Sequence, residues 1–300
     1  MVWLGSSEHV VYASGQGSPA IRMSVRASIN SKRDFPRRGK SNGAHEKQAK
    51  THATTMRNIK LTIEYAGTNY AGWQAQNKKH RTIQQTIEKA LQKILQKKAK
   101  IIGSGRTDAG VHASAQAANF KTDSSLAIEK LQKALNAVLP DDISVIKTEE
   151  AGLDFHSRFS AKSKVYRYTI LNRPSRPAIL RDMAYFFSYP LNLKLMRKDA
   201  RVLLGRHNFK SFQAADKKER DATRTIKNLK ITRDKDFIYI DIEADGFLYN
   251  MVRNIVGTLI EIGRGKLAQG STKKILLARN RKFAGPTVPA KGLCLLEVKY

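Results

Sequence analysis

From Asn58 onward, the hydrophobic pattern switches repeatedly between the period of a strand and the period of a helix. Apolar and polar residues alternate over 59–63, which predicts a half-buried strand. Thr82 can cap a following helix, and a second helix should end before Pro140 because proline cannot continue it. In order, the expected elements are a strand at 59–63, a helix at 83–95, a strand at 115–120, a helix at 126–139 and a strand at 143–146. This order predicts an α+β fold in which a split β-α-β unit carries its helices on one face of a sheet.

The second half of the chain continues this theme with a more strongly apolar helix. Apolar residues recur at helical spacing from Leu248 to Ile262, and Gly263 ends the pattern, so this helix should be central. The other expected elements are a strand at 165–170, a helix at 193–204, a strand pair at 226–231 and 237–242, and a final strand at 292–300. The proline-containing stretch 173–177 breaks the pattern and indicates a crossover. We therefore predict two α/β domains, residues 57–172 and 173–300.

Residues 1–56 differ in composition from the rest of the chain. They are rich in Ser, Gly, Arg and Lys and show no sustained hydrophobic period, so we expect disorder. A transit peptide, a basic tail that binds RNA, and an upstream start codon before a true start at Met56 all fit this composition. We favour the last explanation because a strand is predicted almost immediately after Met56.

Positive charge dominates the composition, with 55 Lys and Arg against 25 Asp and Glu and a formal net charge of +30. Such an excess attracts phosphate backbones, so nucleic acid is the first partner to consider. No uninterrupted apolar run is long enough to cross a bilayer, and we expect a soluble protein without a membrane partner. Cys294 is the only cysteine, so no intrachain disulfide can form, which fits a reducing compartment such as the cytoplasm.

The stretch Gly103–His112, with sequence GSGRTDAGVH, is where we most expect chemistry. Its glycines can adopt backbone angles closed to other residues, so Arg106 and Asp108 can be projected from a tight turn. A carboxylate held there can act as a nucleophile or as a base. Asp108 should be ionised at neutral pH, and more so beside an arginine, which lowers the pKa of a carboxyl group. The alternative is a surface turn with a local Arg-Asp ion pair.

A second unusual loop, Tyr70–Gln76, combines aromatic rings, amides and glycine. Such content suits single-stranded RNA because rings stack on bases and amides reach base edges. The alternative is that Tyr70 and Trp73 anchor the loop to the core. Arg253 lies among apolar residues of the central helix, and because a charge there needs a partner, we expect an acidic residue to meet it.

The stretch Gly105–Ala113 resembles the signature of the tRNA pseudouridine synthase A (TruA) family. Further motifs resemble that family in the same order along the chain, and the resemblance covers Asn58 to Tyr300. These motifs are Tyr70–Gln76, Arg158–Ala161, Tyr166–Tyr168, His207–Phe209, Met251–Arg253 and Gly292–Leu293.

This resemblance implies an enzyme that isomerises uridine to pseudouridine at positions thirty-eight to forty, in the anticodon stem-loop of tRNA. It implies two ferredoxin-like, RRM-like α/β subdomains with mostly antiparallel sheets and a central cleft. A homodimer and the absence of any metal or organic cofactor are also implied. Asp108 matches the catalytic aspartate, which we predict to be the nucleophile, and Arg106 and Arg253 match the basic residues beside it. The predicted substrate-binding residues are Tyr166, which matches the base-stacking tyrosine, with Tyr70, Trp73, Gln74 and His112.

Two other functions compete with this hypothesis. A non-catalytic RNA-binding or ribosome-associated protein of the same fold would share the charge and the aromatic residues but would have no use for Asp108. A metal-dependent nuclease would use Asp108, His112 and His156, although these ligands lack the close spacing of a metal motif. Whether Asp108 attacks the ribose or the base stays open, and Tyr166 taken alone would fit a cross-strand packing role.

Overall fold

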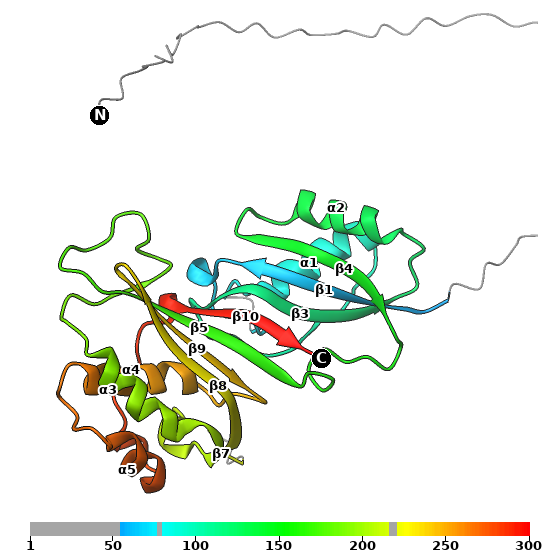
Figure 1. The fold of residues 1–300 in the computed structure, drawn as a ribbon. Coiled ribbons are helices and arrows are strands. Elements are labelled where there is room, and N and C mark those ends of the chain that lie inside the picture. Colours follow the sequence, from blue (N-terminus) through cyan, green and yellow to red (C-terminus); the bar gives the residue numbers. More distant parts are fainter. Residues whose placement is uncertain (1–54, 77–79, 216–220) are drawn as a thin grey trace, which may run out of the picture. The chain divides into compact units, whose positions relative to one another are not determined.

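One mixed β-sheet runs through the part of the chain that the computed structural model describes, residues 55–76, 80–215 and 221–300 (Figure 1). These residues lie within one compact unit, His52–Tyr300. The strands are β1 (Arg57–Tyr65), β2 (Ile102–Gly103), β3 (His112–Thr122), β4 (Ile143–Ala151), β5 (Ser163–Leu171), β6 (Tyr185–Phe186), β7 (Gly205–Asn208), β8 (Thr223–Asp234), β9 (Phe237–Ala244) and β10 (Leu293–Lys299). The expectation of disorder in residues 1–56 lies outside the described residues, except at Thr55 and Met56.

The strand order in the sheet is β4-β1-β3-β10-β5-β9-β8-β7, and β2 and β6 pair with β3 and β5. Every pairing is antiparallel except those of β10 with β3 and of β6 with β5. The predicted α+β class with a mostly antiparallel sheet is therefore confirmed. The last strand along the chain, β10, lies between β3 and β5 and joins the two halves of the sheet.

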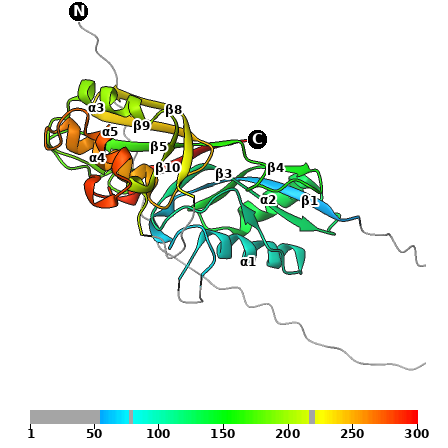
Figure 2. The same cartoon turned by 90° about the horizontal axis from the view of Figure 1, so that it is seen from below.

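Two amphipathic helices, α1 (Ile83–Leu95) and α2 (Ile128–Val138), pack with the half of the sheet that contains β1, β3 and β4 (Figures 1 and 2). As predicted, Thr82 caps α1, and its side chain accepts a hydrogen bond from the backbone N–H of Gln85. The helix predicted to start at 126 begins two residues later. The reason is a local turn in which the Leu126 N–H bonds to the Ser124 side chain.

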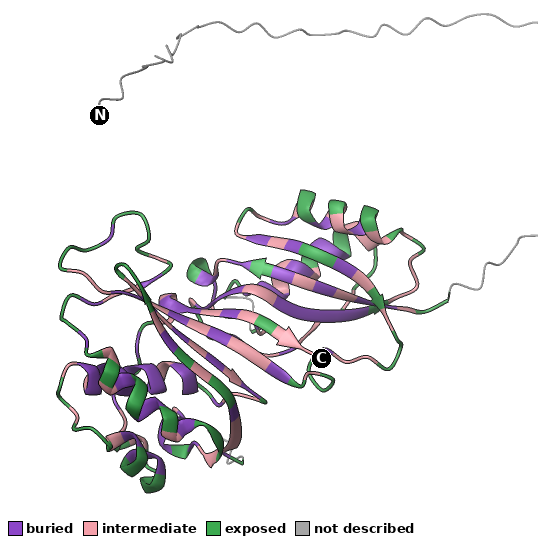
Figure 3. Ribbon diagram, viewed as in Figure 1, coloured by how far each residue is buried: buried purple, intermediate pink, exposed green. Residues whose placement is uncertain are grey.

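The other half of the sheet packs with the helices α3 (Leu193–Ala200), α4 (Met251–Gly263) and α5 (Ser271–Ala278) (Figure 2). The helix α4 is central, as predicted, and Figure 3 shows its nearly continuous burial. Only Arg253 and Glu261 on this helix are partly exposed. The expected helix start at Leu248 is wrong because Asn250 adopts a left-handed conformation, with φ of 58°, and the helix begins after it.

Short connecting elements complete the described fold. The 3-10 turns are η1 (Gly67–Asn69), η2 (Arg201–Leu203), η3 (Lys210–Phe212), η4 (Arg281–Phe283) and η5 (Ala290–Gly292). No helix of the described ranges has the length and apolar character that a membrane span requires. The division into domains at residue 172 stays a prediction.

Candidate active site

The glycine-rich stretch between β2 and β3 carries Asp108 toward the start of helix α4. Arg253 Nη1 lies 3.6 Å from Asp108 Oδ2, and the two side chains are 16% and 27% exposed. An acid therefore meets the charged residue of the apolar helix, as predicted, and the acid is Asp108. Residues about 145 positions apart in the chain thus form one partly buried ion pair.

Arg253 is held by two further hydrogen bonds that fix the direction of its guanidinium group. Its Nε donates to the backbone oxygen of Val288 (2.7 Å), and its Nη1 donates to Asn250 Oδ1 (2.8 Å). Asn250 immediately precedes α4, so the left-handed residue that delays the helix also orients the arginine. The cation is therefore positioned before any substrate arrives.

The pKa of Asp108 is raised above its ordinary value because burial of the carboxylate outweighs the opposing effect of Arg253. Arg253 lowers the pKa of Asp108, as expected, but the desolvation of the carboxylate has the larger effect, so the net shift is upward. A carboxylate that is poorly hydrated and paired with a single cation is more reactive than one in water.

Tyr166 on β5 contributes a wall next to Asp108. Its ring is 6% exposed and packs edge-on against Phe247, with the ring centroids 5.0 Å apart. Burial raises the pKa of the Tyr166 hydroxyl, and the nearby charge of Asp108 acts in the same direction, so this hydroxyl stays protonated at neutral pH. The tyrosine thus provides an aromatic, uncharged surface beside the carboxylate.

The loop that precedes α1 holds the Asp108 loop from the opposite side through its backbone. The Trp73 N–H donates to the Thr107 oxygen (3.0 Å), and the Gly110 N–H donates to the Tyr70 oxygen (3.3 Å). Gly67 lies so close that a methyl group built on it would be 2.0 Å from the Val111 oxygen. The position of Asp108 is therefore set by backbone contacts that tolerate no larger residue at Gly67.

Comparison with known proteins assigns this chain to a family. The family model described as tRNA pseudouridine synthase matches residues 61–160 and 200–300. The chain belongs to the tRNA pseudouridine synthase family. The tRNA pseudouridine synthase A of Clostridium acetobutylicum is 48% identical to this chain over 245 residues, which are 82% of this chain and 100% of the relative. The corresponding proteins of Caldicellulosiruptor bescii and Thermoanaerobacter pseudethanolicus are 47% and 46% identical with the same coverage.

Among solved structures, a chain of a Cbf5-Nop10-Gar1 complex is similar to 79% of this chain and 58% of that chain, with 11% identity and a TM-score of 0.31. This similarity is too low to add to the family assignment, which depends on the family model and the sequence relatives.

In this member of the family, Tyr70 and Trp73 are structural anchors of the site loops. Their side chains are only 3% and 2% exposed. The Tyr70 hydroxyl donates to Asp142, and the Trp73 indole lies against Gly103, where an added methyl group would be 2.5 Å away. The anchoring alternative accounts for both rings. A role in substrate binding stays a prediction for them, and it would act through the position of the loop.

Arg106 and Gln74 form a pair at the outer edge of the site. Arg106 is exposed, and its Nε donates to Gln74 Oε1 (2.9 Å). Gln74 Nε2 donates in turn to Gln84 on α1 (2.7 Å). The local Arg106-Asp108 ion pair of the surface-turn alternative is absent from the described ion pairs, and Asp108 pairs with Arg253 instead.

His112 lies at the end of the Asp108 loop and is 2% exposed. Its Nδ1 accepts from the Gly67 N–H (3.1 Å), so Nε2 carries the hydrogen and donates to the Asp182 oxygen (3.0 Å). Burial lowers the pKa of His112, which fits this neutral form. His112 therefore ties the Asp108 loop to two other segments, and its predicted contact with substrate stays a prediction.

The described residues contain no group of three His, Cys, Asp or Glu side chains that could hold a metal ion. Within these residues, the nuclease alternative therefore lacks a ligand set, and His112 already uses both ring nitrogens.

Lys164 is a residue near the site that the sequence reasoning missed. A methyl group built on Gly105 would lie 3.3 Å from its Cε and 3.8 Å from its Nζ. Because strand residues alternate between faces, Lys164 shares a face of β5 with Tyr166. This alternation could have identified Lys164 from the sequence, because a lysine on the same face of a strand as Tyr166 and Tyr168 is unusual and suggests a role near the site.

Proposed function

We propose that this protein isomerises uridine to pseudouridine at positions thirty-eight to forty, in the anticodon stem-loop of tRNA, with Asp108 as the nucleophile. Membership of the tRNA pseudouridine synthase family makes the chain an isomerase that converts uridine in tRNA to pseudouridine. The observation that best supports the role of Asp108 is its partly buried ion pair with Arg253 across two distant parts of the chain.

The reaction breaks the bond between N1 of uracil and C1′ of ribose and forms a bond between C5 and C1′. The hydrogen on C5 leaves as a proton and N1 gains one, so nothing is oxidised or reduced. Asp108 attacks C1′ or the base, which keeps the uracil and the ribose within the site while the ring turns. Both routes need the ionised carboxylate.

The other site residues have roles that follow from their environments. Arg253 stabilises the Asp108 carboxylate and is fixed by Val288 and Asn250, so it needs little reorganisation during the reaction. Tyr166 supplies the aromatic wall against which the extruded uracil lies, which partly offsets the cost of unstacking. Arg106, with Gln74, meets the RNA at the exposed edge.

The partners follow from the same proposal. The anticodon arm of tRNA is the substrate, and the net charge of +30 favours its phosphate backbone. Two copies of the chain act as a homodimer in the cytoplasm. Light scattering during size-exclusion chromatography tests the dimer, since a single species of monomer mass would contradict it.

Tritium release from tRNA transcripts labelled at C5 of uracil tests the function. The wild type should release tritium, and Asp108→Asn should be slower by on the order of a thousand-fold or more. Transcripts in which the uridines at the target positions are replaced singly by cytidine then test the positions. Binding of tRNA without release by the wild type would instead support the non-catalytic RNA-binding alternative.

A further inference from the structure

The segment that follows β4 presents an aromatic ring to solvent close to the active site. Phe159 is 76% exposed, and the Arg158 guanidinium lies over its ring, 5.6 Å from the centroid. The His156 ring also packs against the Phe159 ring, with the two ring centroids 4.3 Å apart and the ring planes tilted by 31°. An exposed phenylalanine flanked by a cation and an imidazole is the composition of a base-stacking surface.

This segment is held firmly, although its aromatic ring is exposed. Ser157 is fully buried, and both its N–H and its hydroxyl donate to Asn119 Oδ1 (2.9 and 2.7 Å). His156 Nδ1 accepts from the N–H groups of Arg158 and Phe159 (3.2 and 3.3 Å). The orientation of Phe159 is therefore prepared before a ligand binds, which reduces the entropy lost on binding.

Lys164 connects this surface to the Asp108 loop. Its side chain lies along Gly105, and it shares a face of β5 with Tyr166, which borders Asp108. Burial and then the charge of Arg158 lower the pKa of Lys164, while Asp245 acts in the opposite direction. Among the described residues, neither Lys164 nor Arg158 forms an ion pair, so an anion placed between them would relieve their repulsion.

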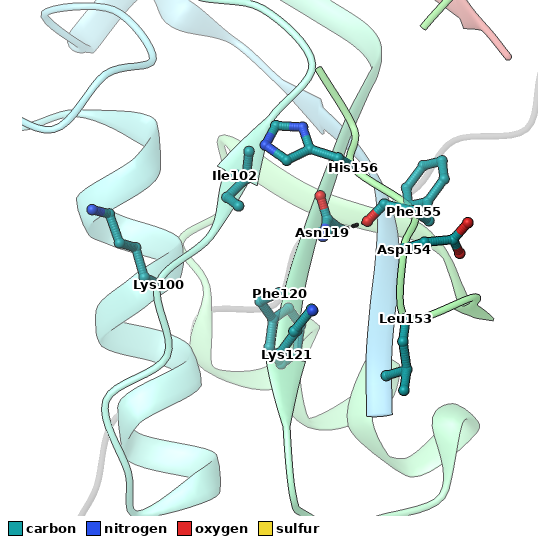
Figure 4. A pocket seen from close by; sticks show the side chains of 9 residues that line it. All are labelled: Lys100, Ile102, Asn119, Phe120, Lys121, Leu153, Asp154, Phe155 and His156. Carbon is teal, nitrogen blue, oxygen red and sulfur yellow. Dashed lines mark hydrogen bonds between the residues drawn. The ribbon is translucent and has the colours of Figure 1, made fainter. Parts of the chain in front are cut away.

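A hollow of about 430 Å³ continues this surface beyond His156 (Figure 4). Lys100 and Lys121 line it together with apolar side chains, and Asp154 is its one acidic residue. Figure 4 shows the His156 ring beside Ile102, which belongs to β2, the strand that precedes the Asp108 loop in the chain. Lys164 lies at the Asp108 loop, Arg158 lies over Phe159, and Lys121 lines the hollow together with His156. We call these three basic residues with Phe159 the basic strip.

We propose that the basic strip binds the single-stranded part of the anticodon arm next to the target uridine, with a phosphate between Lys164 and Arg158 and an unpaired base stacked on Phe159. The charges suit RNA, and the strip starts at the loop that carries Asp108. This inference rests on the proposed function, because it uses the same substrate. It adds the residues that select a single-stranded segment beside the reacting nucleotide.

The first test measures the Kd of tRNA transcripts for variants of Phe159 by fluorescence anisotropy. Phe159→Ala and Phe159→Leu should each raise the Kd about tenfold, whereas Phe159→Trp should keep a Kd close to that of the wild type, because stacking needs an aromatic face. Phe283→Ala is the control, since Phe283 is also exposed (60%) but lies in η4, outside the strip. Binding by Phe159→Ala within twofold of the wild type, or a wild-type Kd for Phe159→Leu, would overturn the stacking role.

The second test measures how the Kd depends on salt. Lys164→Met and Arg158→Gln should each reduce the slope of log Kd against log salt by about 0.7, the value for one phosphate contact on a single strand. The exposed Lys274 of α5 provides the control as Lys274→Gln, which should keep the slope. An unchanged slope in both strip variants would overturn the phosphate site.

A third test separates this proposal from the proposed function. Abasic substitutions through the anticodon loop should reveal one nucleotide whose base contributes to binding by the wild type but not by Phe159→Ala. If the wild type released tritium but no nucleotide showed this difference, the proposed binding by the basic strip would be contradicted and the proposed function would stand. Absence of tritium release would defeat the proposed function, whereas the binding cycle would still decide whether the strip holds a base.

Discussion

The Asp108 loop has two sides that are built in different ways. On the scaffold side, the segment 66–76 contacts it through backbone hydrogen bonds and buried rings, with Gly67 and Trp73 in closest approach. On the reactive side, α4 meets it with the partly exposed Arg253, and β5 meets it with the buried ring of Tyr166. Packing positions the loop from one side, and charge acts on it from the other.

This difference shows that a motif rich in aromatic residues need not bind the ligand. Trp73 and Phe159 are both aromatic residues of connecting segments, yet Trp73 is 2% exposed and Phe159 is 76% exposed. Variants on the scaffold side should therefore lose stability and activity together. Variants on the reactive side should lose activity or binding while the fold is kept.

The largest effect is expected for Trp73→Ala, which should lower the free energy of unfolding by about 3–5 kcal/mol because it empties a fully packed site. Phe159→Ala should change it by less than about 0.5 kcal/mol, since little of that ring is buried. Urea denaturation of both variants measures the difference. Equal destabilisation of the two would remove the distinction between an anchor and a binding surface.

A loss of roughly 100-fold in kcat is expected for Gly67→Ala, because the new methyl group must displace the Val111 carbonyl and with it the Asp108 loop. Single-turnover tritium release measures the rate. Gly265→Ala is a matched control: its φ of +77° strains an alanine by about 1–2 kcal/mol, but nothing lies within 4 Å. If Gly67→Ala kept the wild-type rate, the backbone contacts would not set the position of Asp108.

A shift in pH dependence is expected for Arg253→Met. The reaction needs ionised Asp108, so activity falls as pH falls through its pKa, which is already above the ordinary value. Loss of the arginine raises this pKa further, and the acid limb of the pH-rate profile should move up by about one to three pH units. Arg253→Lys should move it less, since it keeps a positive charge. An unmoved acid limb in Arg253→Met would show that the pair has no part in ionising Asp108.

The smallest effect is a pH-dependent gain in stability for Asp108→Asn. Between the ordinary pKa of 3.8 and its raised value, the folded protein holds a proton on Asp108 that the unfolded chain has lost. The free energy of unfolding of the wild type therefore falls as pH rises through this window. In Asp108→Asn this contribution to the fall is absent, because asparagine does not ionise. The variant should melt at a higher temperature than the wild type at neutral pH and at the same temperature below the window. A lower melting temperature at neutral pH would mean that the carboxylate stabilises the fold.

Much of the fold followed from the sequence because local signals and tertiary packing agree. The Thr82 cap and the apolar face of α1 predicted that helix with its observed bounds. The alternation over 59–63 predicted β1, and the expected strands at 226–231 and 237–242 lie within β8 and β9, which are joined at Lys235, with φ of 49°. The helix α5 was missed because it is short and its apolar residues follow lysines.

The candidate site was less accessible to sequence reasoning, because its properties depend on distant parts of the chain. An acidic partner for Arg253 was expected, but its identity as Asp108 follows only from the folded arrangement. The raised pKa of Asp108 depends on how deeply several elements bury it, which no local pattern reports. The sequence allowed Trp73 either to contact RNA or to anchor its loop, and its burial depends on Gly103, a residue of another segment that lies against its ring.

The position of β10 has a consequence for the order in which the protein becomes active during synthesis. Residues 293–299 are translated after all the other described strands, yet they form β10, which links β3, next to the Asp108 loop, with β5, which carries Tyr166. A nascent chain can fold its first sheet half early, because those contacts are local. We therefore expect the aspartate and the tyrosine to be brought into register only when β10 is inserted, so a ribosome-bound chain that still lacks β10 should be unable to modify RNA.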